Sequence, residues 1–226
     1  MSVPGEVVVT PDVPEAFTAQ VLDAFRARPL DTFSLTLSGG DTARSCYEHL
    51  AEHAGNQVDW WKVDVYWGDE RCVPHDHVDS NYYLAREALL DRVGAANATH
   101  LMRCAEGPDP YQLRLGDLGR IDLVHLGMGA DGHTASLFPR SEALDADPGR
   151  LVAMNDDPTG AHPYRRMTLT FAGIARARLV VVTVSGADTA DALAAIAAGH
   201  DLPAARIEAD RVVWLVDHAA AAGLPG

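Results

Sequence analysis

The stretch IDLVHLGMGADGHTASLFP, residues 121–139, decides the fold. Residues 121–126 form a short and mostly apolar run, which is typical of a strand buried inside a sheet. The next residues include glycines at positions 127, 129 and 132. These glycines permit a tight turn and a close approach of the backbone to a ligand. The stretch therefore predicts a buried strand that ends in a loop suited to a binding or catalytic site.

Strand and helix patterns alternate along the rest of the chain. Strands are expected at residues 6–10, 31–40, 63–67, 121–126, 166–171, 177–184 and 211–217, and helices at residues 13–28, 42–54, 80–93 and 187–199. Alternation of this kind, with strands that are almost continuously apolar, predicts a mostly parallel sheet. We expect a doubly wound α/β fold with helices on both faces of that sheet. No internal repeat or long linker divides the chain, so we expect a single domain over residues 1–226.

The charge balance limits the possible partners. The chain has 226 residues, with 18 Lys and Arg against 32 Asp and Glu, a formal net charge of −14. Such a surface repels nucleic acid and anionic membranes, so we expect neither as a partner. No apolar run approaches the roughly 20 residues that a membrane-spanning helix needs. The first residues also lack the basic and apolar regions of a signal peptide. We expect a cytoplasmic protein that acts on a small molecule.

The cysteines and histidines give no sign of a disulfide framework or a metal site. Cys46, Cys72 and Cys104 are odd in number and widely spaced, without a CxxC motif. We therefore expect no disulfide framework, in keeping with a reducing compartment. His75 and His77 lie in an irregular loop with no further ligand pattern, so we expect no metal ion.

The glycines of the opening stretch have the GxGxxG spacing of a dinucleotide-binding fingerprint. A true fingerprint opens a long crossover helix, and an acidic residue follows about 20 residues later. Here Pro139 comes seven residues after Gly132, which leaves room for only one or two helical turns. Asp156 and Asp157 do lie at a tolerable distance. We disfavour a nicotinamide or flavin site and expect no cofactor.

The loop SGGDT follows the strand expected at residues 31–40. Ser38, Gly39, Gly40 and Thr42 lie where that strand turns into a helix. The first turn of a helix offers free N–H groups and a partial positive charge, which together bind phosphate or another anion. A tight turn in which Asp41 or Thr42 caps the helix explains the pattern about equally well. The loop lacks the lysine of a P-loop, which argues against a nucleoside triphosphate.

Two further loops carry charged groups at the ends of strands. In WGDERCVP, Arg71 is suited to a phosphate or a developing oxyanion, with Asp69 beside it, although a solvated charged turn is the alternative. In the opening stretch, Asp131 and His133 are two residues apart. A carboxylate beside an imidazole orients a general base. An isolated Asp-x-His is more often an Asx-turn. Because ligands of open α/β sheets bind at the carboxyl ends of the strands, all three loops are expected to meet there.

Together these loops resemble the 6-phosphogluconolactonase family, within a wider group that includes glucosamine-6-phosphate deaminase. The resemblance covers most of residues 37–217. Its most specific motifs are WGDERCVP with DSNY, and GMGADGHTASLFP; the supporting ones are LSGGDTARSCYEHLA, IDLVHL, RRMTLTFAGIARAR, SGADTADAL and VVWLVD.

The resemblance implies hydrolysis of 6-phospho-D-glucono-1,5-lactone to 6-phosphogluconate, in the oxidative pentose phosphate pathway, without a cofactor. It implies that His133 activates water, that Asp131 orients it, and that the imidazolium then protonates the departing ring oxygen. It also implies that the SGG turn and Arg71 bind the sugar phosphate or polarise the site. The implied partner is a small phosphorylated sugar lactone, acted on by a monomer or a small homo-oligomer.

Two positions depart from the family pattern. Asp41 follows the paired glycines, where the family commonly has another residue before Thr-Pro. Thr189 stands where the family often has a lysine that helps to hold phosphate. Both changes make the pocket less positive. We expect Arg165 to compensate, with Arg44 and Arg166 as alternatives.

Two other functions remain open on the sequence. A glucosamine-6-phosphate deaminase-like isomerase resembles this chain at DGH, but that group has Asp-Glu-Tyr where this chain has Asp69-Glu70-Arg71. A non-catalytic sugar-phosphate-binding regulator is favoured only by Thr189. The intact pair of Asp131 and His133 argues against the regulator.

Overall fold

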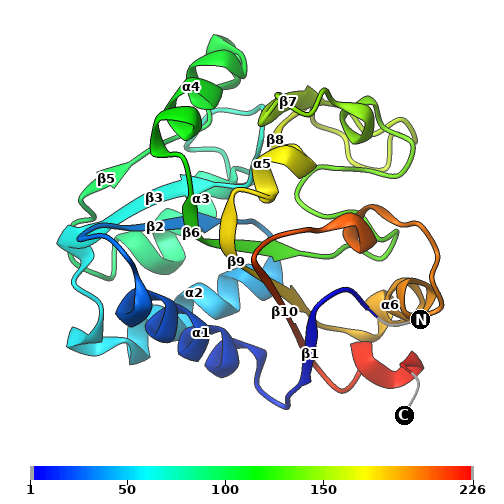
Figure 1. Cartoon of the computed structure of the whole chain (residues 1–226), viewed down its shortest axis with the longest axis horizontal. Coiled ribbons are helices and arrows are strands. Elements are labelled where there is room, and N and C mark those ends of the chain that lie inside the picture. Colours follow the sequence, from blue (N-terminus) through cyan, green and yellow to red (C-terminus); the bar gives the residue numbers. More distant parts are fainter. Residues whose placement is uncertain (1–2, 225–226) are drawn as a thin grey trace.

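A parallel sheet of seven strands forms the centre of the molecule (Figure 1). The computed structural model describes residues 3–224. In spatial order, the strands are β1 (Glu6–Val9), β10 (Arg211–Val216), β9 (Ala177–Val184), β6 (Ile121–Gly127), β2 (Phe33–Leu37), β3 (Val63–Trp67) and β5 (Ala98–Thr99). Every neighbouring pair runs parallel. Six of the seven predicted strands therefore lie in this sheet, whereas the strand predicted at residues 166–171 belongs to a second sheet and β5 was not predicted.

The direction of winding reverses between β2 and β6. From β2 the chain moves outward to β3 and β5, returns to β6 beside β2, and then continues through β9 and β10. In open α/β sheets the ligand binds at such a reversal, outside the carboxyl ends of the strands. The loops that follow β2 and β6 are the SGG turn and the GMGADGH loop, so the topology places both at the expected position of a site.

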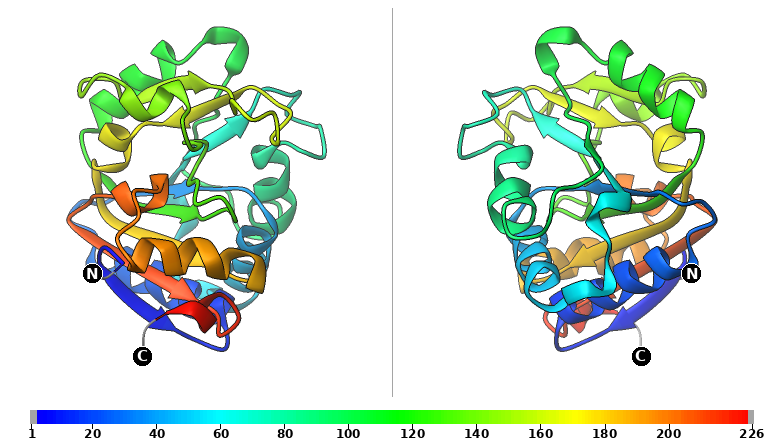
Figure 2. Two further views of the ribbon diagram at one scale, coloured as in Figure 1. Left: turned by 90° about the vertical axis from the view of Figure 1, so that its right-hand side faces the viewer. Right: turned by 90° about the vertical axis from the view of Figure 1, so that its left-hand side faces the viewer.

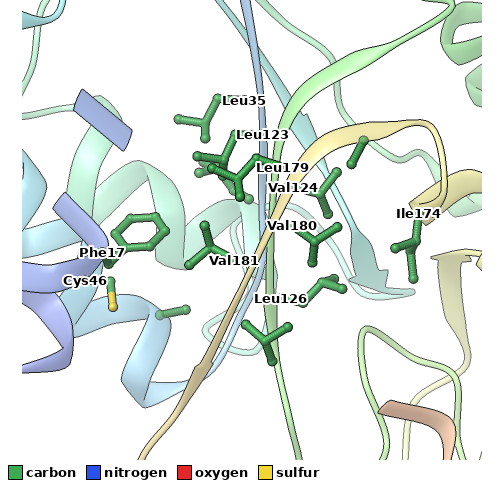
Figure 3. Packing of buried hydrophobic residues seen from close by; sticks show 14 of the residues in the cluster. Phe17, Leu35, Cys46, Leu123, Val124, Leu126, Ile174, Leu179, Val180 and Val181 are labelled. Carbon is green, nitrogen blue, oxygen red and sulfur yellow. The ribbon is translucent and has the colours of Figure 1, made fainter. Parts of the chain in front are cut away.

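Helices lie on both faces of this sheet, which confirms the doubly wound α/β fold. They are α1 (Val13–Ala27), α2 (Asp41–His53), α3 (Asn81–Ala85, continued by a π-helical turn at Arg86–Leu90), α4 (Asp109–Leu118), α5 (Phe171–Ile174) and α6 (Ala190–Ala197). Short 3₁₀ turns occur at Gly55–Gln57, Trp60–Lys62, Cys104–Glu106, Glu142–Asp145, Ala187–Thr189, Pro203–Arg206 and Ala220–Gly223. In Figure 3, Phe17 of α1 and Cys46 of α2 pack on one side of the strands, and Ile174 of α5 packs on the other.

A second, antiparallel sheet lies beside the central one (Figure 2). It consists of β4 (Asp69–Arg71), β8 (Arg166–Leu169) and β7 (Val152–Asn155), in the order β4-β8-β7. The segment expected to be a charged turn is therefore strand β4, because β8 supplies its hydrogen-bonding partner. The register pairs Arg71 directly with Arg166. This pairing fixes the direction of two cationic side chains.

The expectation of no disulfide is wrong. Cys72 and Cys104 are bonded to each other, with a separation of 32 positions in sequence and 5.4 Å between their Cα atoms. Cys46 is buried and free. Sequence spacing did not reveal the pair, because the end of β4 and the loop after β5 meet only in the folded chain. Among the described residues, no helix is long and apolar enough to cross a bilayer.

A buried histidine links the core to the SGG turn. His125 of β6 is fully buried, with 2.8 Å between its Nδ1 and the Tyr47 hydroxyl and 2.9 Å between its Nε2 and Thr183 Oγ1. The Tyr47 hydroxyl also accepts the backbone N–H of Ser38 at 2.7 Å. Burial lowers the pKa of His125 to about 3. The imidazole therefore remains neutral in the folded protein.

This depressed pKa predicts a loss of stability in mild acid. In the unfolded chain an imidazole takes up a proton near about pH 6.5, so between that pH and about pH 3 the unfolded state binds one more proton. The free energy of unfolding should fall by about 1.4 kcal/mol for each pH unit of acidification in this window. Urea unfolding of wild type and His125→Asn at about pH 7 and about pH 5 tests this. The variant is expected to be less stable than wild type, but its free energy of unfolding should fall less between the two pH values. An equal fall in the two proteins would contradict the prediction.

Candidate active site

A cavity of about 450 Å³ lies at the carboxyl ends of the central strands. The loops after β2, β6 and β9 line it, together with side chains of β4 and β8. Of the residues predicted from the sequence, the cavity lining includes Ser38, Gly39, Gly40, Thr42, Asp69, Arg71 and His133. The structure therefore brings the three predicted loops together, as the sheet topology required.

His133 and Asp131 form a hydrogen-bonded pair at the edge of the cavity. His133 Nδ1 lies 2.5 Å from Asp131 Oδ1, and the His133 backbone N–H donates to the same oxygen at 3.0 Å. Burial raises the pKa of Asp131, but the hydrogen bond and charge of His133 outweigh it, so the pKa lies below its ordinary value. Because an ionised carboxylate only accepts hydrogen bonds, Nδ1 carries the proton and Nε2 is left as the basic nitrogen.

Gly129 makes room for this imidazole. A Cβ at position 129 would lie 2.2 Å from His133 Cε1 and 3.0 Å from Asp131 Oδ1. Both distances are shorter than van der Waals contact, so any side chain at position 129 would displace the ring. The glycine spacing that resembles a dinucleotide fingerprint therefore serves the Asp–His pair. The assigned helices also include none within residues 133–141, where a fingerprint would open its crossover helix.

Gly129→Ala is expected to lower the kcat of a reaction in which His133 takes part by about 10²-fold, because displacing a reacting group by about 1 Å slows the reaction by that factor. Gly116→Ala is the matched control. Gly116 lies in α4 with open space at its Cβ, so the change should leave activity unaltered and stabilise the helix by up to about 1 kcal/mol. Steady-state kinetics and thermal unfolding of both variants check this. Wild-type kcat in Gly129→Ala would show that the imidazole tolerates displacement.

The SGG turn opens α2 toward the cavity. Gly40 is the N-cap residue, with φ of +97° and no side-chain cap, so neither Asp41 nor Thr42 caps the helix as the alternative required. The first N–H groups of α2 are therefore free of a side-chain cap. Gly39 packs against Asn81, because a Cβ there would lie 1.9 Å from Asn81 Oδ1. The carboxylate of Asp41 also lines the cavity.

Buried carboxylates hold the loop that follows β4. Asp69 Oδ2 accepts the Ser136 hydroxyl at 2.5 Å, and Asp69 Oδ1 accepts the Asn81 amide at 3.1 Å. Glu70 accepts the backbone N–H groups of Arg71, Asn81 and Tyr82. Burial raises the pKa of Glu70, against the effect of these hydrogen bonds. The structure therefore gives Asp69 and Glu70 positioning contacts around the cavity wall.

Arg71 and Arg166 supply the positive charge of the cavity. Arg71 donates from Nη1 to the Asp79 carbonyl at 2.9 Å. Arg166 is only 5% exposed, its Nε is buried without a hydrogen-bond partner, and its guanidinium forms no ion pair within residues 3–224. Burial lowers the pKa of Arg166, although Asp69 opposes this. Like charges directly opposite each other destabilise an antiparallel pair, so this arrangement is suited to an anion between them.

Arg165, the cation predicted from the sequence, lies elsewhere. Its side chain is 61% exposed, pairs with Asp156 at 3.6 Å, and does not line the cavity. Arg165 directly precedes β8, and of these two neighbouring arginines only Arg166 lines the cavity. His162 also lines the cavity and was missed, because no periodic pattern marks the loop between β7 and β8. No group of three or more residues suited to a metal ion occurs in the described part of the chain.

The fold and the cavity define an α/β protein with a cavity suited to a small anionic ligand, which lies at the switch point of its sheet beside a paired Asp and His. The chain belongs to the family of glucosamine-6-phosphate isomerases and 6-phosphogluconolactonases, whose model matches residues 6–214. The resemblance inferred from the motifs is therefore confirmed.

Curated relatives and solved structures agree with this family. The chain is 37% identical to the 6-phosphogluconolactonase of Mycobacterium tuberculosis over 84% of this chain and 85% of that protein. It is also 37% identical to the 6-phosphogluconolactonase of a Nostoc species, over 96% and 98% of the two chains. The 6-phosphogluconolactonase structure from Trypanosoma cruzi superposes with a TM-score of 0.83 at 26% identity, over 100% of this chain and 99% of that one.

Proposed function

We propose that this protein hydrolyses 6-phospho-D-glucono-1,5-lactone to 6-phosphogluconate. Its relatives in Mycobacterium tuberculosis and Nostoc are named 6-phosphogluconolactonase. The observation that carries the proposal is the joint presence, in one cavity, of the His133 imidazole and the cations of Arg71 and Arg166. A lactone carbonyl needs an activated water, and a phosphate needs positive charge. The cavity offers a base that can activate water and two cations that can bind phosphate. The proposed substrate places the reaction in the oxidative pentose phosphate pathway.

In this reaction His133 acts as the general base. Nε2 takes a proton from water while the water oxygen forms a bond to C1 of the lactone, and the carbonyl electrons move to the carbonyl oxygen. Asp131 holds the ring through Nδ1 and stabilises the imidazolium that forms. The tetrahedral intermediate then collapses as the carbonyl double bond re-forms, and the bond between C1 and the ring oxygen breaks. A proton equivalent to the one taken up by His133 passes to the departing oxygen, so a carboxylic acid and a hydroxyl group result. Removal of this proton by an oriented base typically contributes about 10²–10⁴-fold to the rate.

The positive side of the cavity is assigned to the phosphate. Arg71 and Arg166 are the two cations, and the free N–H groups at the start of α2 follow Ser38, Gly39 and Gly40. Thr42 lies in the first turn of that helix and adds a hydroxyl. Asp69 is assigned to positioning through Ser136 and Asn81. Arg165 is not part of this assignment, because its side chain lies outside the cavity lining.

Hydrolysis of freshly made 6-phosphogluconolactone tests the function, with spontaneous ring opening subtracted and gluconolactone assayed in parallel. Rapid turnover of the phosphorylated lactone alone is expected. Turnover of both lactones would show that the cavity does not select for phosphate. No turnover of either would overturn the proposal. Ammonia release from glucosamine 6-phosphate would instead support the deaminase-like alternative, whose solved relative shares the fold with a TM-score of 0.81 at 17% identity.

We propose a cytoplasmic location and a monomer or small homo-oligomer. A phosphorylated lactone is charged and does not cross a bilayer unaided, so the enzyme must work in the compartment that produces its substrate. The cysteines no longer support this location, since Cys72 and Cys104 are paired. Alkylation of free thiols in intact cells would report the state of this pair, and light scattering after size-exclusion chromatography would report the oligomer.

A further inference from the structure

A second Asp–His pair faces the same cavity. His162 Nδ1 lies 2.9 Å from Asp157 Oδ2, and the His162 backbone N–H donates to the same oxygen at 3.0 Å. The Asp157 side chain is 3% exposed. Burial opposes ionisation of this carboxyl, but hydrogen bonds from Thr159 and His162 hold its pKa well below the ordinary value. The contacts repeat those between Asp131 and His133, which lie in a different loop.

The two imidazoles are neighbours. Their ring centroids are 4.8 Å apart with an interplanar angle of 74°, and His162 stacks on Phe138 at 4.7 Å. Phe138 is buried, so it supports the His162 ring from one side. The side chain of His162 is 30% exposed and lines the cavity. Since Nδ1 is engaged by Asp157, Nε2 is the nitrogen available to a ligand.

Carboxylates and cationic or basic groups both lie around His162. Asp157 lies on the same loop as His162. Asp131 comes from the loop after β6, and the charge of His162 is one of the influences that lower the pKa of Asp131. His133 is the neighbouring imidazole, and the Arg166 guanidinium lies 6.0 Å from the centroid of the Phe138 ring. The surroundings of His162 therefore contain two carboxylates, Asp157 and Asp131, and two cationic or basic groups, Arg166 and His133. Of these groups, Asp157 makes the direct contact with the His162 ring.

We propose that His162 is a second catalytic residue, which protonates the ring oxygen of the lactone as the bond to C1 breaks. The proposal rests on the lactone hydrolysis proposed above. His133 Nε2 accepts the proton of water, and His162 Nε2 donates a proton to the departing oxygen, which becomes the 5-hydroxyl group. His133 then releases its proton to solvent, and His162 takes one up. No oxidant, metal or further reactant is needed.

Two imidazoles can divide the two proton transfers of this reaction between them. A single ring must accept a proton from water and then deliver it to the departing oxygen in turn. Two rings with centroids 4.8 Å apart, each held by its own carboxylate, allow one to begin neutral and the other protonated. Such a pair produces a bell-shaped dependence of kcat on pH, with one limb for each group.

His162→Asn is the most informative variant. The asparagine amide replaces Nδ1 as a donor to Asp157, so the loop stays anchored, but no acidic nitrogen remains in the place of Nε2. We expect kcat to fall by about 10²-fold, KM to change by less than about 3-fold, and the alkaline limb of the pH profile to disappear. His200→Gln is the matched control, because His200 is exposed and does not line the cavity. It should behave as wild type.

Asp157→Asn provides a second test, because it should shift the pH dependence of kcat. A purely structural role of His162 would leave that pH dependence unchanged. The His162 imidazolium loses the charge that stabilises it, so the alkaline limb is expected to shift to lower pH while the acid limb stays in place. Profiles between about pH 5 and pH 8 cover both limbs. An unchanged kcat and pH profile in both variants would overturn the proposal, as would a rise in KM alone, which indicates binding only. An inactive wild type would overturn the proposed function itself, so the two failures are distinguishable.

Discussion

His133→Ala is expected to lower kcat for the phosphorylated lactone by about 10²–10⁴-fold, the contribution of one oriented general base. The variant lacks the only nitrogen of the Asp131–His133 pair that is free to accept a proton from water, because Nδ1 is engaged by Asp131. KM should change little, since the proposed phosphate ligands lie on other elements. Stopped assays with the spontaneous rate subtracted give both constants.

Two measurements separate loss of chemistry from loss of structure in His133→Ala. The thermal unfolding midpoint and the affinity for 6-phosphogluconate should both remain near wild type, because within residues 3–224 the His133 side chain hydrogen-bonds only to Asp131. Asp131→Asn should show a smaller loss of kcat, since the imidazole stays but its orientation and tautomer are no longer fixed. Activity close to wild type in His133→Ala would remove His133 from the mechanism, whatever the activity of the native protein.

The part of the site that sequence predicted consists of the ends of buried strands. The glycine turns after β2 and β6 are visible because they interrupt apolar runs, and parallel strands bring their carboxyl ends to one edge. Asp131, His133 and Arg71 could therefore be placed together without coordinates. The same logic identified Gly129 as part of a loop, but not the contact it makes with the His133 ring.

The part that sequence missed depends on contacts between segments without periodicity. Asp157 and His162 lie between β7 and β8, where no alternation or helical pattern exists to orient them. Cys72 and Cys104 meet because loops of different strands converge. The preference for Arg165 over Arg166 selected the side chain that lies outside the cavity lining, for a different reason. A strand alternates its faces at every residue, so an uncertainty of one position reverses the direction of the side chain.

The two departures from the family pattern acquire a physical meaning from these contacts. Thr189 is buried, and its hydroxyl donates to the Gly186 carbonyl at 2.8 Å, so it offers no charge to a phosphate. Asp41 adds a negative charge to the cavity lining. Arg166 is the buried cation that opposes this loss, and it lies opposite Arg71 in the β4–β8 pair. The affinity for phosphate should therefore depend on Arg166 more than on any other residue.

Arg166→Met is expected to raise KM for the phosphorylated lactone by about 10²-fold or more. A charge-assisted hydrogen bond contributes roughly 1.5–3 kcal/mol, guanidinium pairs with phosphate are often bidentate, and each 1.4 kcal/mol is tenfold in affinity. The free protein should not be destabilised, because the change removes a buried cation that has no hydrogen-bond partner for its Nε within residues 3–224, and because it relieves the repulsion with Arg71. Kinetics with both lactones and urea unfolding measure these effects.

Arg165→Met is the matched control for Arg166→Met. It removes the same side chain one position earlier, where the guanidinium is exposed and pairs with Asp156, so KM should change by less than about 3-fold. Gluconolactone, which has no phosphate, should lose little in either variant, so the ratio of the two lactones isolates the contribution of the phosphate. If Arg165→Met raises KM and Arg166→Met does not, the phosphate binds outside the cavity, and the exposed arginine is its ligand. If only Arg166→Met raises KM, the buried guanidinium of Arg166 has taken over the role of the lysine that Thr189 replaces. The bound phosphate then relieves the repulsion between Arg166 and Arg71, which explains why the fold tolerates that repulsion.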